Sequence, residues 1–189
     1  MRQPLTMIPL VLMAGCATTE MHTSQSMTVE RKPPAGEFAS NTVDFGIVVS
    51  DAAKAAEFYQ RALGFTEVPG FDVPADMGGD SGLSDYQPFH VRIMVLGQTP
   101  GATKVKLMEF RDAPGARPDN RFIHSTLGVR YLTLYVTEID AAVERARKAG
   151  AAPLAKGPIV LPKGFPAGVY LAVVRDPDGN MIELVGPRK

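Results

Sequence analysis

The feature that most constrains the fold of this 189-residue chain is an internal repeat. When Asp44 is set against Tyr131, Val49 falls on Val136, and both stretches alternate between apolar and polar side chains. Such alternation is typical of a half-buried β-strand, and in each copy an amphipathic helical stripe follows it. Self-similarity at a fixed spacing indicates that one structural unit occurs twice. We therefore expect two modules of the same architecture.

The first copy predicts a strand from about residue 43 to residue 49, followed by a helix. Ser50 or Asp51 can cap this helix, and Gly64 is placed to end it. Three further strands are expected near residues 66–68, 89–96 and 103–111. The order of elements in this copy is βαβββ.

The second copy repeats that order, with a strand at 131–136 and a helix whose capping box begins at Thr137 and which ends at Gly150. Its later strands are expected near residues 153–161, 170–175 and 181–185. The last two strands flank residues 176–180, Asp-Pro-Asp-Gly-Asn, in which proline presets φ and glycine adopts positive φ. This stretch predicts a β-hairpin.

Two glycine-rich segments are too long to be simple connections. The segment 69–88 contains four glycines and four aspartates, and the segment 156–168 contains three glycines among prolines. We interpret the first as a mobile lid and the second as a mobile rim of a binding site.

The N-terminus has a pattern of its own. Arg2 precedes the short apolar run 5–13, which ends in Met-Ala-Gly-Cys at residues 13–16. This resembles a bacterial lipoprotein signal, which implies removal of residues 1–15, lipidation of Cys16 and a flexible tether over residues 16–40. The expected location is the cell envelope, at the outer membrane or on the periplasmic side. The alternative is a cytosolic protein with a single buried cysteine.

Charge and cysteine content exclude two classes of protein. Twenty basic and twenty acidic side chains leave no net charge, and no basic cluster is interleaved with aromatic residues, so nucleic acid is not an expected partner. Because the chain has one cysteine, it cannot form an internal disulfide.

Several motifs together resemble those of the vicinal oxygen chelate superfamily, which includes glyoxalases, bleomycin-resistance proteins and extradiol dioxygenases. These motifs are the two βαβββ modules, Phe58-Tyr59 ahead of Leu63-Gly64-Phe65, and the closing turn 176–180 followed by Ile182-Glu183-Leu184. The resemblance covers residues 41–187. It implies an α+β domain over 41–189, with modules at about 41–112 and 129–187. In this family the strands curl into a cup, helices cover the convex face, and active members hold a divalent metal in the cup.

The resemblance places the four metal-ligand positions at Asp44, Lys106, Tyr131 and Glu183. Only Glu183 matches the pattern of the family; Asp44 is a possible oxygen ligand and Tyr131 an uncommon one, whereas the Lys106 ammonium has no lone pair to donate. At about 4 Å and an effective dielectric near 20, it would oppose a divalent ion by roughly 8 kcal/mol. We therefore expect a cup without a metal cofactor, in which Lys106 forms an ion pair with Asp44 or Glu183. If a metal binds, its ligands would be Asp44, Glu183 and His90.

Strand alternation suggests the rest of the cup. If Val91 and Ile93 pack under the helices, His90 and Arg92 face inward with Lys106. Tyr131 and Tyr135 line the other side. Such a cup is cationic and suits a small polar or anionic ligand.

Three functions follow as hypotheses. The first is a membrane-anchored domain that binds a small molecule in a metal-free cup, as bleomycin-resistance proteins do. The second is a divalent-metal-dependent lyase, isomerase or dioxygenase with an unusual ligand set. The third is a degenerate domain with a structural or interaction role. The sequence predicts neither an oligomeric state nor whether the domain is catalytic.

Overall fold

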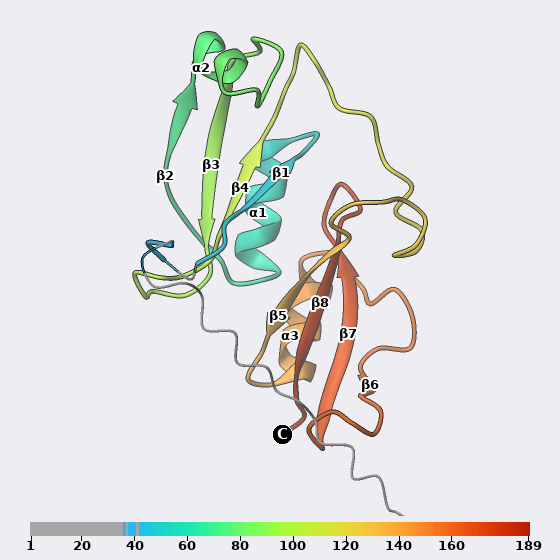
Figure 1. Ribbon diagram of the computed structural model, residues 1–189. Coiled ribbons are helices and arrows are strands. Elements are labelled where there is room, and N and C mark those ends of the chain that lie inside the picture. The colour runs from blue at the N-terminus through green and yellow to red at the C-terminus, as the bar shows by residue number, and fades with distance from the viewer. Residues whose placement is uncertain (1–35, 37, 41) are drawn as a thin grey trace, which may run out of the picture. The chain divides into compact units, whose positions relative to one another are not determined.

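Each copy of the repeat folds around its own four-stranded mixed sheet (Figure 1). The computed structural model describes residue 36, residues 38–40 and residues 42–189. Cys16, the expected signal sequence and nearly all of the expected tether lie outside the described residues. Every helix and strand among the described residues belongs to one compact unit, residues 40–189.

The first module contains β1 (Phe45–Val48), α1 (Ala52–Arg61), β2 (Thr66–Val73), α2 (Ala75–Asp80), β3 (Phe89–Val95) and β4 (Lys104–Met108). Its sheet has the order β1-β4-β3-β2, with β1 parallel to β4 and the other pairs antiparallel.

The second module contains β5 (Tyr131–Tyr135), α3 (Ile139–Lys148), β6 (Ile159–Val160), β7 (Val169–Arg175) and β8 (Met181–Pro187). Its order, β5-β8-β7-β6, mirrors the first, and β5 is likewise parallel to β8. The predicted α+β class and the two βαβββ modules are confirmed. The short helix α2 is an addition in the first module, and β6 is much shorter than the expected strand at 153–161.

Local hydrogen bonds explain where the two long helices begin. The Asp51 side chain caps α1 by accepting a bond from the Lys54 amide at 2.9 Å, as predicted. The cap of α3 is Glu138 and not Thr137, because the Glu138 carboxylate accepts from the first-turn amides. The capping-box prediction was therefore one residue early.

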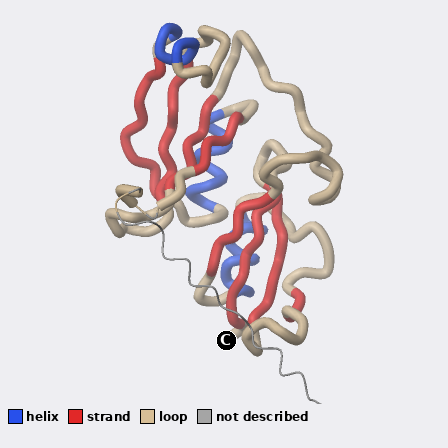
Figure 2. Tube along the Cα trace, in the orientation of Figure 1, coloured by secondary structure: helices blue, strands red, loops and turns tan. Residues whose placement is uncertain are grey.

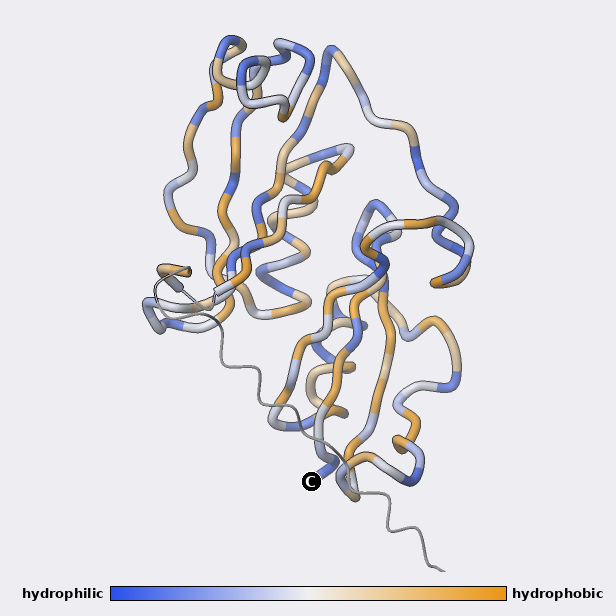
Figure 3. Tube along the Cα trace, in the orientation of Figure 1, coloured by the Kyte–Doolittle hydropathy of each residue, from blue (hydrophilic) through white to orange (hydrophobic). Residues whose placement is uncertain are grey.

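The helices α1 and α3 each pack on one face of their sheet (Figures 1 and 2). Most of the buried apolar side chains of both modules form one hydrophobic cluster, whose largest fully buried members include Tyr59, Met94, Leu107, Ile139, Ile182 and Leu184. Hydrophobic residues run along the strands of both sheets with polar ones between them (Figure 3). We call the face of each sheet opposite its helix the open face.

The glycine-rich segment 69–88 is more regular than the sequence suggested. Strand β2 continues into it through a bulge, and α2 follows. A methyl group added to Gly78 would clash with Ser84, and one added to Gly79 would overlap the Tyr86 ring. Close packing therefore explains these glycines without invoking a mobile lid.

Candidate functional site

Strand pairing decides which side chains of the first module line its open face. Val105 and Leu107 lie in the core under α1, so Lys106 between them points to the open face. Ile93 pairs with Lys106 and shares that face, whereas Met94 pairs with Val105 and is fully buried in the core.

His90 and Arg92 therefore lie on the helix side of the sheet, and the prediction that they face inward was wrong. The physical reason is that the open face has an apolar cluster of its own, formed by Val73, Phe89, Val91, Ile93, Met108 and Phe110. Val91 and Ile93 belong to that cluster and not to the core under α1.

His90 and Arg92 both have acidic partners on the helix side of the sheet. Arg92 donates two hydrogen bonds to Glu67, at 2.7 and 2.9 Å, and His90 Nδ1 lies 2.7 Å from Asp72 Oδ1. Hydrogen bonding to Arg92 holds the pKa of the Glu67 carboxyl below its ordinary value. The sequence-based argument for an anionic ligand relied on these two side chains together with Lys106, and the structure removes the part of that support that came from His90 and Arg92.

The predicted ion pair between Lys106 and Asp44 is confirmed. Lys106 Nζ lies 3.2 Å from Asp44 Oδ2, and Asp44 Oδ1 accepts the backbone N–H of Lys104 at 3.2 Å. Burial acts to raise the pKa of Asp44, but the hydrogen bonds from Lys106 and from the Lys104 backbone hold it below its ordinary value. No ion pair links Lys106 to Glu183 within the part of the chain that the structure describes.

This arrangement does not fit a divalent cation. The Lys106 ammonium takes up the Asp44 carboxylate that a metal would need, and it has no lone pair of its own. His90 cannot join Asp44 and Glu183, because it lies on the other face of the sheet. Across residues 42–189, no group of three or more His, Cys, Asp or Glu side chains is placed to hold a metal ion.

The open face of the second module is lined by side chains that alternate with core residues. Tyr131, Thr133 and Tyr135 lie on this face of β5, and Glu183 of β8 pairs directly with Thr133. The Thr133 hydroxyl donates a 2.7 Å hydrogen bond to Glu183 Oε2. Three of the predicted site residues, Tyr131, Tyr135 and Glu183, thus come together.

A cavity of about 720 Å³ opens over this face. Its walls are Tyr131, Thr133, Tyr135, Val136, Leu161, Phe165, Pro166, Val169, Leu171, Glu183, Val185, Gly186 and Pro187. The only carboxylate among them is that of Glu183. The volume is in the range of sites for small organic molecules.

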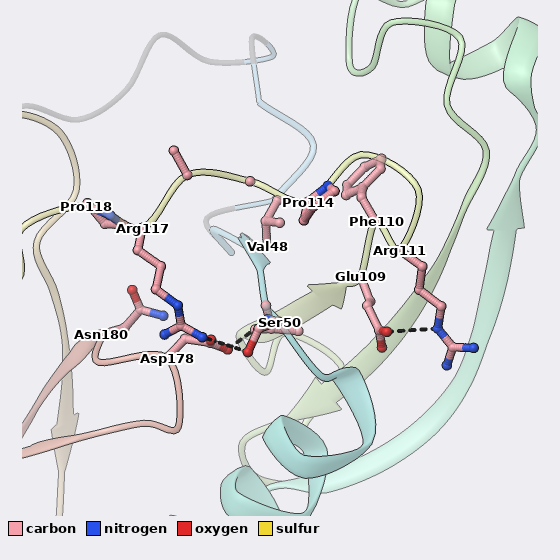
Figure 4. Close-up of a pocket in the computed structure, with 13 residues that line it drawn as sticks. Val48, Ser50, Glu109, Phe110, Arg111, Pro114, Arg117, Pro118, Asp178 and Asn180 are labelled. Atoms are coloured by element: carbon pink, nitrogen blue, oxygen red, sulfur yellow. Dashed lines mark hydrogen bonds and ion pairs between the residues drawn. The ribbon is translucent and has the colours of Figure 1, made fainter.

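A second cavity, of about 390 Å³, lies where the β1–α1 junction meets the turn between β7 and β8 (Figure 4). Its charges are compensated within the protein. Glu109 Oε1 accepts from Arg111 at 2.8 Å, and Asp178 lies 3.5 Å from Arg117 (Figure 4). The sequence analysis missed this cavity, because residues 112–118, which form much of its wall, showed no periodic pattern. Paired charges make it a weaker candidate for binding a ligand than the open face of the second module.

The turn at residues 176–180, in the second module, is hydrogen-bonded to the first module. Asp178 accepts hydrogen bonds from the Ser50 amide, at 3.0 Å, and from the Ser50 hydroxyl, at 2.5 Å (Figure 4). The Tyr59 hydroxyl donates to Asp176 at 3.5 Å. We call Ser50, Tyr59, Asp176 and Asp178 the inter-module latch.

The latch is polar, and its Tyr59 and Asp176 members are buried whereas Ser50 is exposed. The Asp176 side chain is 5% exposed, and it accepts further bonds from the Asp178 amide and from Asn180. Burial raises the pKa of Asp176, and burial followed by the Asp176 charge raises that of Tyr59. The sequence analysis predicted the hairpin but not that its acids bind the other module.

Solved structures with a similar fold are numerous. A glyoxalase family protein from Bacillus cereus is 23% identical with a TM-score of 0.65, covering 82% of this chain and 100% of that one. The trypanothione-dependent glyoxalase I of Leishmania major is 20% identical with a TM-score of 0.54, covering 78% and 87%. A glyoxalase/bleomycin resistance protein/dioxygenase domain from Frankia is 20% identical with a TM-score of 0.53, covering 79% and 93%.

These identities are low, so the likeness concerns the fold alone. No curated protein sequence matches the chain. A family model does match, over residues 41–184, which is most of the chain. The chain therefore belongs to the glyoxalase/bleomycin resistance protein/dioxygenase superfamily.

Proposed function

We propose that this protein is a lipid-anchored domain that binds a small organic molecule without the help of a metal. The observation that carries the proposal is the ion pair between Lys106 and Asp44, 3.2 Å apart, at two positions where the family resemblance implies metal ligands. A protonated amine there supplies the positive charge that a metal ion would otherwise bring.

The cavity over the second module supports the binding part of the proposal. It has the volume of a small-molecule site, and its lining is mainly apolar and aromatic with a few polar groups at Thr133 and Glu183. Among the described residues, the lining contains no Cys, His or Lys, and its hydroxyl–carboxylate pair, Thr133 with Glu183, has no third group to orient it, so binding without chemistry is the simplest activity that the geometry supports.

The anchoring part of the proposal depends on Cys16, which follows Met-Ala-Gly behind an apolar run. Within the described residues, no helix has the length and apolar character needed to cross a bilayer. Attachment to a membrane of the bacterial envelope would therefore depend on the lipidated cysteine and not on residues 42–189.

The experiment that tests metal independence measures bound metal in three proteins. Each full-length protein is incubated with Mn²⁺, Ni²⁺ and Zn²⁺ and then dialysed. The metal that stays bound is quantified by elemental mass spectrometry. We expect the wild type to retain substoichiometric metal. Lys106→Glu places a second carboxylate beside Asp44 and should raise metal retention, because it removes the cation and adds an oxygen ligand.

Lys104→Glu is the matched control, since residue 104 lies on the same strand and the same face, two residues away. It should leave metal retention at the wild-type level. One equivalent of tightly held metal in the wild type would contradict the proposal and favour the metal-dependent enzyme.

A further inference from the structure

Glu183 is a carboxylate without a cationic partner. In the part of the chain that the structure describes, no Lys, Arg or His forms an ion pair with it, and none lines its cavity. Its one hydrogen bond comes from the Thr133 hydroxyl to Oε2. The second oxygen, Oε1, accepts no bond from the described residues and is available to a ligand.

Aromatic side chains line the same cavity as this carboxylate and are open to solvent. Tyr131 is 46% exposed, Phe165 is 58% exposed and Tyr135 is 83% exposed, and all three line the cavity. Tyr131 and Tyr135 lie on either side of Thr133, which pairs directly with Glu183. A carboxylate attracts an organic cation through its charge, and an aromatic ring attracts it through the ring face. This cavity offers both groups.

Other ligand classes fit less well. An anion would meet the Glu183 charge with no Lys, Arg or His in the lining to offset it. A divalent metal would find one carboxylate and one hydroxyl, too few of the oxygen ligands that such ions require. A neutral apolar molecule would bury the carboxylate and leave it unsatisfied.

We propose that the open face of the second module binds an organic ammonium ion, with Glu183 as its counter-ion and Tyr131 and Tyr135 against its apolar part. The cavity volume of about 720 Å³ suits a drug-sized amine. This inference rests on the proposed function, because it names the class of ligand for the cavity over the second module that supports the binding part of that proposal.

The test titrates the full-length protein with three small probes and follows NMR chemical shifts. The probes are benzyltrimethylammonium, benzyl alcohol and phenylacetate, which share a ring and differ in charge. We expect the ammonium probe to bind at least about 10-fold more tightly than the other two. The shifts should concentrate on β5 and β8.

Two variants and one control assign the effect to this face. Glu183→Gln keeps the shape and the hydrogen bond from Thr133 but removes the charge, and it should weaken ammonium binding by about 10-fold or more while leaving benzyl alcohol unchanged. Tyr135→Leu, at an 83% exposed position that the core does not need, should weaken it by about 2- to 5-fold. Glu144→Gln removes the same charge on α3, on the other side of the sheet, and should have no effect.

The outcomes separate this inference from the proposed function. Equal affinity for the three probes, no binding of the ammonium probe, or an unchanged affinity in both Glu183→Gln and Tyr135→Leu would overturn the inference and leave metal-independent binding of another ligand class standing. If the wild type binds a stoichiometric metal through Glu183, and this metal displaces the ammonium probe, both proposals are wrong.

Discussion

Replacing Lys106 by Met tests the ion pair at the centre of the first module's open face. Methionine keeps much of the bulk of lysine and removes its charge. Asp44 then loses its bond to the ammonium, although it still accepts the Lys104 amide. The free energy of unfolding should therefore fall.

The structure indicates the size of this change. At 3.2 Å, two unit charges attract by about 5 kcal/mol at an effective dielectric of 20 and by about 1 kcal/mol in water. The Lys106 and Asp44 side chains retain 35% and 26% exposure, so solvent screening and desolvation remove most of the larger figure. We expect a loss of about 1 kcal/mol, or about 2–4 °C in Tm for a chain of this size. A much larger loss would require a second carboxylate facing Lys106.

The loss should depend on pH in a defined direction. The folded state holds the pKa of Asp44 below its ordinary value of 3.8. A carboxyl with a depressed pKa contributes stability that is complete well above the unfolded value and is lost as the pH falls through the folded value. The difference between wild type and Lys106→Met should thus be constant near neutral pH and shrink below about pH 4.

Urea denaturation of both proteins between pH 3 and pH 7 measures this difference. Lys104→Met is the matched control, since it removes a lysine from the same strand and face that forms no ion pair among the described residues, and its effect should stay within about 0.5 kcal/mol. A Lys106→Met protein as stable as the wild type at pH 7, or equal losses in the two variants, would refute the reasoning.

Three further predictions concern other parts of the chain. Cys16→Ala should release the protein from the membrane fraction, and retention after a high-salt wash would contradict lipid anchoring. Asp178→Ala removes both bonds from Ser50 and should cost about 2 kcal/mol of unfolding free energy in urea denaturation. In hydrogen exchange, the amides of Leu83 and Ser84, which bond to the Gly78 carbonyl, should be protected. Rapid exchange there would restore the hypothesis of a mobile lid.

The fold was predictable from sequence because its signals are local and occur twice. Alternation identified the strands. The first helix was expected to end at Gly64, and its φ of +82° is one that glycine adopts readily. Two boundaries were less predictable. Strand β2 continues past Pro69 through a bulge, and only two residues of the expected strand at 153–161 pair with β7.

The site was predicted only in part, for a reason visible in β3. Alternation shows that His90 and Arg92 share one face, and that Val91 and Ile93 share the other. It does not show which of the two faces meets the helix when the open face is apolar as well. Glu67, which forms the ion pair with Arg92 on the helix side, lies 25 residues away from Arg92 on another strand. No local pattern therefore reveals this pairing.

The inter-module latch has a consequence for the order in which the chain folds during synthesis. Ser50 and Tyr59 find their partners 128 and 117 residues further along the chain. A ribosome must therefore synthesise nearly the whole protein before the first module can satisfy these groups, and contacts of such long range form slowly. Until Asp176 emerges, the Tyr59 hydroxyl has no acceptor in its native position. The hydrogen bond of the buried Tyr59 hydroxyl to Asp176 therefore forms only after most of the second module has been synthesised.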